Sequence, residues 1–192
     1  MLKRNQQDPP KRVILGNSIV HYWGGEPAQW PNRGSQSWAR YLVPNQVRNL
    51  GFGWDRIENV LWRVYQGALD GYEAIDVVIM IGTNNLQVNT DEEITAGLAH
   101  LIRAVKQRQP SAHVTLCGLL PRENMEPRIA ALNPLIAQVA EQENVDYLNI
   151  GEGFLTPSGM IDASLFVDGL HPNEAGYEKI AKKIAPTFRK DK

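Results

Sequence analysis

The chain has 192 residues, of which 43% are hydrophobic and 21% are charged, and its formal net charge at pH 7 is −1. This composition is typical of a globular domain with a sizeable core. The near-neutral charge argues against a nucleic-acid partner, because phosphate binding normally requires a basic excess. No run of about 18 or more apolar residues occurs, so no membrane span is predicted.

The first ten residues are mostly polar, and we expect them to form an N-terminal tail. One domain should follow over 11–192, because no linker, repeat or low-complexity tract interrupts the rest of the chain. The N-terminus lacks the apolar stretch of a secretory signal. A cytoplasmic location is therefore expected, and secretion stays open if a leader has been removed.

Five short apolar segments alternate with amphipathic helical patterns, which is typical of a parallel sheet covered by helices on both faces. Each segment finishes in glycine, where a chain can turn sharply and where ligands approach open α/β sheets. The predicted strands are, in chain order, 13–15, 46–50, 76–81, 113–117 and 145–150. Cys117, the single cysteine, ends the fourth strand, where we expect a buried thiol that excludes an internal disulfide.

Helix start signals precede the apolar stripes between these strands. Asp55 followed by Glu58 fits a capping box, and Thr90 followed by Glu93 fits a second one. Both are followed by apolar residues at helical spacing, so each predicts a helix packed on the sheet.

Two more helices and one long loop complete the predicted organisation. A helix is expected over 129–142, where Pro134 should kink or delay it, and a terminal helix over 173–188. The stretch 24–37 is rich in Gly, Pro, Asn, Gln and Ser and is expected to be a long surface loop. Long loops in compact domains are often functional.

Polar residues with catalytic potential follow two strands and precede the terminal helix. Ser18 follows the first strand, Asn84 follows the third, and Asp168 lies three residues before His171. An Asp at this spacing can accept a hydrogen bond from one ring nitrogen of the His and leave the other free as a base for a serine. Taken singly, each is better explained as a turn or a cap. Their combination at one sheet edge predicts nucleophilic acyl transfer.

These residues resemble the sequence blocks of the SGNH (GDSL-type) hydrolase family, in the family's order and over nearly the whole chain. The nucleophile, glycine, asparagine and Asp-x-x-His blocks of the family are matched by 16–18, 49–55, 82–84 and 168–171. The stretches 82–85 and 118–122 are also similar to the catalytic subunits of intracellular platelet-activating-factor acetylhydrolase.

The resemblance implies a three-layer α/β/α, flavodoxin-like fold with a five-stranded parallel sheet in the order 2-1-3-4-5. It also implies an ester hydrolase that needs neither a metal nor another cofactor. Ser18 would be the nucleophile, His171 the base and Asp168 the residue that orients it. The oxyanion would be held by the backbone N–H groups of Ser18 and Trp54 and by the side chain of Asn84.

The sequence departs from the family pattern at two positions. Asn17 stands where the family usually has Asp, which removes one negative charge but keeps the hydrogen-bonding shape. Trp54 stands where the family usually has the oxyanion glycine. A backbone N–H donates whatever its side chain, but if this position needs a positive φ, Trp would be strained there.

Substrate-binding candidates lie close to these blocks. They are Asn17, His21, Trp23, Trp30 and Asn85. Packing or turn formation is an equally simple explanation for several of them, above all for Trp23, whereas Trp30 is the best candidate for a platform under a sugar ring. Arg33 and Arg122 could contact an anionic substrate, although exposed arginines are usually just solvated.

The leading hypothesis is a serine esterase acting on short acyl esters, with acetyl groups on a small molecule or a carbohydrate as the expected substrates. A non-catalytic module that binds a sugar or an acyl compound is the alternative, and the changes at Asn17 and Trp54 favour it. A flavodoxin-like cofactor carrier would need a phosphate-binding loop where His21 stands. The absence of zinc, P-loop and dinucleotide motifs predicts no metal or nucleotide site. The oligomeric state is left open.

Overall fold

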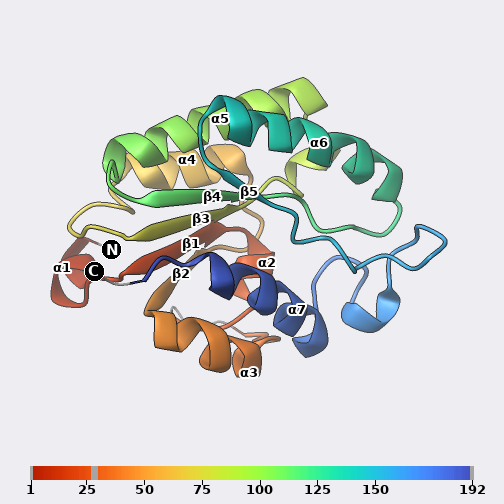
Figure 1. Cartoon of the computed structure of the whole chain (residues 1–192), viewed down its shortest axis with the longest axis horizontal. Helices are drawn as coiled ribbons and strands as arrows, with labels where there is room; N and C mark the ends of the chain where they lie inside the picture. Colours follow the sequence, from red (N-terminus) through yellow and green to blue (C-terminus); the bar gives the residue numbers. More distant parts are fainter. Residues whose placement is uncertain (1, 27–29, 191–192) are drawn as a thin grey trace.

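The computed structural model describes residues 2–26 and 30–190, which form a parallel β-sheet between two layers of helices (Figure 1). The strands are β1 (Arg12–Gly16), β2 (Val47–Gly51), β3 (Asp76–Met80), β4 (His113–Cys117) and β5 (Asp146–Leu148). All neighbouring strands are parallel, and their order is β2-β1-β3-β4-β5. The expected three-layer, flavodoxin-like class and its strand order are confirmed.

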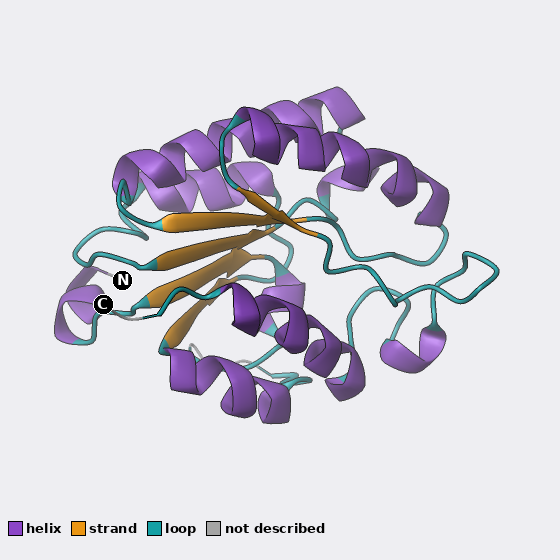
Figure 2. Cartoon of the chain, viewed as in Figure 1, coloured by secondary structure: helices purple, strands orange, loops and turns teal. Residues whose placement is uncertain are grey.

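Helices cover both faces of the sheet (Figures 1 and 2). One face carries α4 (Ile57–Tyr65), α5 (Asp91–Arg108) and α6 (Glu126–Gln142), and the other carries α2 (Ser18–His21), α3 (Ser35–Ser37) and α7 (Glu174–Ile184). Helix α1 (Leu2–Gln7) precedes β1. Shorter helical turns of other types span Trp38–Leu42, Val43–Asn45, Asn85–Gln87, Ala163–Leu165 and Ala185–Thr187.

Each strand supplies two separate cores, because successive side chains of a strand point to opposite faces. In β1, Val13 and Leu15 enter the core under α4, α5 and α6. Ile14, between them, enters the core under α7, where it joins Tyr177 and Ile180. Val13, Ile14 and Leu15 are all fully buried, which explains why the middle of the strand is a continuous apolar run rather than an alternating one.

Several element boundaries differ from those predicted. β2 begins at Val47 because Gln46 has a left-handed φ of 50°. Asp55 does not cap α4, since its carboxylate binds Arg63 instead. The helix begins after Arg56, whose backbone N–H donates to the side chain of Asn59.

The predicted capping box of α5 is confirmed. The hydroxyl of Thr90 accepts from the backbone N–H of Glu93, and the Glu93 carboxylate accepts from the N–H of Thr90. Helix α6 begins at Glu126 and continues through Pro134, so the proline does not delay it. Pro127 lies in the first turn of α6, where a backbone N–H has no intrahelical partner to lose.

The segment expected to be an N-terminal tail contains α1, which packs on the domain. The side chain of Asn5 is fully buried and donates to the carbonyl groups of Ala68 and Asp70. It also accepts from Arg48 of β2. Such a buried amide needs these partners, so α1 is part of the domain rather than a separate tail.

The loop predicted over 24–37 ends in helix α3, and its residues 27–29 lie outside the described part. Cys117 is buried as expected, and burial raises the pKa of its thiol to about 12. Within the described residues, no helix is both long and apolar enough to cross a membrane.

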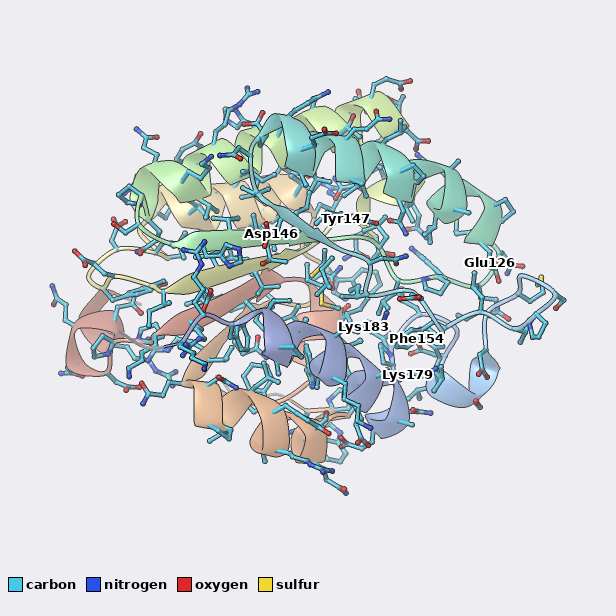
Figure 3. The ribbon with its side chains drawn as sticks, viewed as in Figure 1. Glu126, Asp146, Tyr147, Phe154, Lys179 and Lys183 are labelled. Atoms are coloured by element: carbon cyan, nitrogen blue, oxygen red, sulfur yellow. The ribbon has the colours of Figure 1, made fainter. Side chains whose placement is uncertain are left out.

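The long connection from β5 to α7 is attached to α7 by two lysines (Figure 3). Lys183 donates to the carbonyl of Asn149 at 3.3 Å and pairs with Glu152 at 2.7 Å. Lys179 donates to the carbonyl of Gly153, and its ammonium lies 5.6 Å from the centre of the Phe154 ring. These contacts fix the start of the segment that later carries Asp168 and His171.

Candidate active site

Ser18 is the first residue of α2, directly beyond the end of β1. The side chain of Asn17 accepts from the backbone N–H of Ile19 at 2.9 Å and so caps the helix. Gly16 lets the turn close tightly, because a Cβ at this position would lie 2.2 Å from a methyl of Val20 and 2.8 Å from the carbonyl oxygen of Met80. The hydroxyl of Ser18 is thereby presented at the carboxyl end of the sheet, where ligands of such folds bind.

His171 contacts Ser18 across the sheet edge. Its Nε2 lies 2.9 Å from Ser18 Oγ, and its Nδ1 lies 2.9 Å and 3.0 Å from the two carboxylate oxygens of Asp168. The oxygen Oδ1 of Asp168 also accepts from the backbone N–H groups of Leu170 and His171. The short spacing between Asp168 and His171 therefore serves two purposes, since one carboxylate both closes the loop and binds the ring.

The electrostatic environment favours a charged Asp168 and a neutral His171. Partial burial would raise the pKa of Asp168, but hydrogen bonds from the backbone and ring of His171 and from Arg33 outweigh it and lower the pKa to about 2. Burial lowers the pKa of His171, against the opposing effect of Asp168, and the charges of Arg33 and Arg122 lower it further. A neutral imidazole is the form that can accept a proton.

Trp54 lies in a tight turn directly after β2. The turn is closed by a hydrogen bond from the N–H of Asp55 to the carbonyl of Phe52, and Trp54 has a positive φ of 66°. The N–H of Gly53 donates to His21 Nδ1 at 3.1 Å. The N–H of Trp54, by contrast, makes no hydrogen bond within residues 2–26 and 30–190. Of these two N–H groups in the turn, that of Trp54 is therefore the one able to donate to an oxyanion.

The strain that the sequence leads us to expect at Trp54 is thus present, and it predicts a stabilising substitution. A left-handed conformation costs a non-glycine residue about 1–2 kcal/mol. Glycine avoids this cost, but its greater freedom in the unfolded chain lowers the free energy of unfolding by about 0.5–1 kcal/mol. The side chain of Trp54 is 85% exposed, so little packing is lost. Trp54→Gly should therefore raise the free energy of unfolding by up to about 1 kcal/mol in urea titrations.

Asn124 provides a matched control for this prediction. It is exposed and has a φ of 62°, but Asn tolerates this conformation well. Asn124→Gly should therefore leave stability nearly unchanged or lower it slightly. A Trp54→Gly protein less stable than the parent would show that the turn is not strained.

Asn84 follows β3, the neighbour of β1 in the sheet. Its side-chain NH₂ donates to the carbonyl of Asp55 at 2.9 Å. This bond uses one of the two amide hydrogens and connects Asn84 to the turn that carries Trp54. The second amide hydrogen is left to donate elsewhere, so Asn84 combines a fixed position with a remaining donor.

His21 and Arg63 form hydrogen bonds that hold the turn of Trp54 in place. His21 Nδ1 accepts from the N–H of Gly53, and burial lowers the pKa of this histidine. Arg63 donates to the Asp55 carboxylate and to the carbonyl of Leu50, and its guanidinium lies 4.4 Å from the centre of the Phe52 ring. The apolar spacing that predicts α4 gives no hint of this role for Arg63.

Three of the five predicted substrate-binding residues have structural positions instead. Asn17 is 2% exposed and its side chain caps α2. Trp23 is fully buried, stacks on Tyr177 with ring centres 5.4 Å apart, and donates its indole N–H to Ser37. Asn85 is 3% exposed. These side chains lie too deep to bind a substrate, so the prediction is wrong for them.

Asn85 organises the start of α4. Its oxygen accepts from the N–H of Ile57, and its NH₂ group donates to Glu58 and to Asn89. A buried amide with this many partners is a structural element. Of these two adjacent residues, Asn84 therefore lies at the site, whereas Asn85 stabilises the fold.

The other two candidates remain near the surface. Trp30 is 85% exposed, next to the undescribed residues 27–29, and a role under a sugar ring stays a prediction. His21 is half-buried against Phe52, with ring centres 5.6 Å apart. Its contact with Gly53 makes it a support of the turn, and a direct contact with substrate stays a prediction.

A cleft of about 290 Å³ opens beside His171. Its lining is mostly charged, from Arg122, Glu123 and Asp168, and Leu170 is its single apolar side chain in the described part of the chain. The guanidinium of Arg122 also donates to the carbonyl of Thr83 at 3.2 Å. The arrangement of hydroxyl, imidazole and carboxylate next to an open cleft can perform nucleophilic acyl transfer.

The sequence is similar to proteins of known family. The model of the GDSL-like lipase/acylhydrolase family matches residues 14–179. The platelet-activating factor acetylhydrolase IB subunit alpha2 of Rattus norvegicus is 34% identical over 152 residues, which cover 77% of this chain and 66% of that protein. The chain therefore spans slightly under two thirds of the length of this relative.

Solved structures share the fold. A GDSL-like lipase from Bacteroides thetaiotaomicron superposes with a TM-score of 0.75 at 20% identity, covering 91% of this chain and 85% of that one. An acetyl-xylooligosaccharide esterase from Geobacillus superposes with a TM-score of 0.70 at 17% identity, covering 96% and 98%. The family match and the shared fold lead to one conclusion: the chain belongs to the GDSL-like lipase/acylhydrolase family of ester hydrolases.

Proposed function

We propose that the protein is a serine esterase that hydrolyses short acyl esters, acetyl esters above all, through an acyl-enzyme and without a metal. The observation that carries this proposal is the 2.9 Å contact between Ser18 Oγ and His171 Nε2, with Asp168 bound to the opposite ring nitrogen. A hydroxyl, a base and an orienting carboxylate are the groups that acyl transfer requires.

In the first step, Ser18 Oγ attacks the ester carbonyl carbon while His171 Nε2 takes the hydroxyl proton. The carbonyl electron pair moves to oxygen, and this oxyanion accepts hydrogen bonds from the N–H groups of Ser18 and Trp54 and from the Asn84 side chain. The C–O bond to the alcohol then breaks, and His171 gives its proton to the leaving oxygen. An acyl-Ser18 remains.

In the second step, His171 takes a proton from water, whose oxygen attacks the acyl carbon. The resulting oxyanion is held by the same donors. Collapse of this intermediate breaks the bond to Ser18 Oγ, which takes the proton back from His171, and the carboxylic acid leaves. Asp168 stays ionised throughout and stabilises the imidazolium that forms in both steps.

The shape of the site supports a short acyl group. In the described part of the chain, the cleft that His171 lines offers one apolar side chain, Leu170, which is too little for a fatty acyl chain to pack along it. The names of two similar proteins, an acetylhydrolase and an acetyl-xylooligosaccharide esterase, agree with acetyl esters. We include acetylated carbohydrates among the proposed substrates, with Trp30 as the candidate sugar platform.

Chain length and probe labelling test this proposal. Acetyl, butyryl and octanoyl p-nitrophenyl esters should be cleaved with kcat/KM falling in that order, and faster cleavage of the octanoyl ester would contradict a short-acyl site. A fluorophosphonate probe should label the protein at Ser18 alone. A non-catalytic binding module on the same fold would neither react with the probe nor turn over any ester.

The lowered pKa of His171 predicts the pH dependence. The imidazole is the active base only when neutral, so activity is lost as pH falls through its pKa. Because burial lowers this pKa from the ordinary histidine value of about 6.5, the acid limb of kcat/KM should have its midpoint below pH 6.5. A pH series from 4 to 9 with p-nitrophenyl acetate measures this limb, and a midpoint above about 6.5 would contradict the prediction.

A further inference from the structure

Arg33 binds the carboxylate of Asp168 from outside the loop that carries Asp168 and His171. The guanidinium nitrogen NH1 lies 3.1 Å from Asp168 Oδ2. Oδ1 accepts from two backbone N–H groups and lies 3.0 Å from His171 Nδ1, whereas Oδ2 lies between His171 Nδ1 and Arg33. Arg33 is therefore the residue from outside the loop that fixes the second oxygen of this carboxylate.

Arg33 also holds the aromatic ring that lies against the base. Its backbone N–H donates to the carbonyl of Tyr22 at 2.7 Å, and its guanidinium lies 5.3 Å from the centre of the Tyr22 ring. The Tyr22 ring in turn lies 5.2 Å from the His171 ring. Because Tyr22 follows α2 directly, Arg33 connects the helix that begins at Ser18 with the loop that carries Asp168 and His171.

The chain around Arg33 is anchored in the core. Gly34 packs against Trp23 and Tyr177 so closely that a Cβ there would lie 2.6 Å from both rings. The carbonyl of Gly34 accepts from the hydroxyl of Ser37 at 2.9 Å. An arginine attached to such a fixed backbone loses less freedom when it forms its ion pair, so the contact is pre-organised.

We propose that Arg33 is a positioning residue of the active site, acting through Asp168 and Tyr22 to keep the His171 imidazole aimed at Ser18. This inference rests on the proposed esterase function. It assigns Arg33 a role different from the substrate contact considered from the sequence, because the guanidinium is engaged at the carboxylate. A planar, bidentate-capable side chain suits this position better than a lysine.

The charges around His171 determine the sign of the effect. The charged or titratable groups around the ring are Asp168 from its own loop, Arg33 from the segment before α3, Arg122 and Glu123 from the segment after β4, and the phenol of Tyr22. Asp168 stabilises the imidazolium, and the two arginines oppose it. Removing the positive charge of Arg33 takes away one cation that destabilises the imidazolium. It also leaves the negative charge of Asp168 less neutralised, so Asp168 stabilises the imidazolium more. Both changes raise the pKa of His171.

Arg33→Gln and Arg33→Lys test the proposal with two readouts. In Arg33→Gln, kcat/KM for p-nitrophenyl acetate should fall about tenfold or more, by analogy with the loss of a residue that orients a metal-binding His. Its acid limb should move to higher pH by a few tenths of a unit or more. Arg33→Lys keeps the charge, so it should restore the acid limb while recovering only part of kcat.

The second readout does not depend on turnover. The chain has four histidines, and NMR titration of their ring protons, with the His171→Ala spectrum to assign the resonance, reports the pKa of His171 directly. This pKa should rise in Arg33→Gln and stay near the parent value in Arg33→Lys. The control Arg40→Gln, which removes an exposed arginine next to Glu178, should change neither the titration nor the rate.

The outcomes separate this inference from the proposed function. An active, Ser18-dependent enzyme in which Arg33→Gln lowers only the melting temperature, with the acid limb and the His171 titration unchanged, would overturn the positioning role and leave the esterase intact. Activity that survives Ser18→Ala would overturn the esterase itself. If Arg33→Gln does not fold, the same comparison between Arg33→Lys and Arg40→Gln decides, because a lysine that loses rate at an unchanged melting temperature supports the role.

Discussion

Replacing Ser18 by alanine should lower kcat/KM for p-nitrophenyl acetate by at least about 10⁴-fold, because no nucleophile remains to form the acyl-enzyme. The residual rate would come from the oxyanion donors alone. Stability should fall by only about 1 kcal/mol, since one partly buried hydrogen bond, from Ser18 Oγ to His171, is lost. Steady-state kinetics together with urea unfolding measure both effects on one protein.

Ser164→Ala is the matched control. Its hydroxyl bonds to Asp162 in an exposed turn far along the β5–α7 connection, so its loss should leave turnover unchanged. Labelling with a fluorophosphonate, followed by mass spectrometry, should place the adduct on Ser18 in the parent and detect none in Ser18→Ala. Undiminished turnover in the folded Ser18→Ala protein would rule out Ser18 as the nucleophile.

Asn84→Ala should lower kcat by about 10²- to 10³-fold with little change in KM, because an oxyanion donor acts mainly in the transition state. The variant also loses the bond from Asn84 to the carbonyl of Asp55, so the turn that carries Trp54 should loosen slightly. Saturation kinetics with the acetyl ester separate the two parameters. A loss confined to KM would indicate that Asn84 binds substrate rather than the oxyanion.

The neighbouring residue gives the contrasting result. Asn85→Ala removes a buried amide with three partners, the backbone of Ile57 and the side chains of Glu58 and Asn89. Its expected effect is a loss of roughly 2–3 kcal/mol in the free energy of unfolding, with the folded fraction retaining most of its kcat. Two adjacent asparagines should thus give opposite patterns in kinetics and in stability.

Much of the fold follows from the sequence for physical reasons. Strands buried on both faces are continuous apolar runs, so β1, β3 and β4 can be located without a structure. The grouping of Ser18, Asp168 and His171 is predictable because parallel strands and the loop before the last helix meet at one sheet edge. The helix capped by Thr90 is predictable because a capping box is a local signal.

Other features depend on tertiary contacts that no local pattern contains. Asp55 has the sequence signature of a cap, but Arg63 engages its carboxylate. Trp23 has the sequence signature of a loop aromatic, but in the fold it lies in the core. Its stacking partner there is Tyr177, which is 154 positions further along the chain. The pairing of Arg33 with Asp168 spans 135 positions. The packing of the layers determines which side chains meet in these pairs. The sequence alone therefore does not show which partner each side chain contacts.

The bond between His21 and Gly53 implies that acid acts at two places in the molecule. His21 Nδ1 accepts this bond from a backbone N–H, so a proton on that nitrogen abolishes it and frees the turn beneath the oxyanion. Loss of the base and release of the turn are then separate protonation events. The acid limb of the rate should therefore be steeper than a single titrating imidazole produces, because His21 adds a second loss of activity to that caused by protonation of His171.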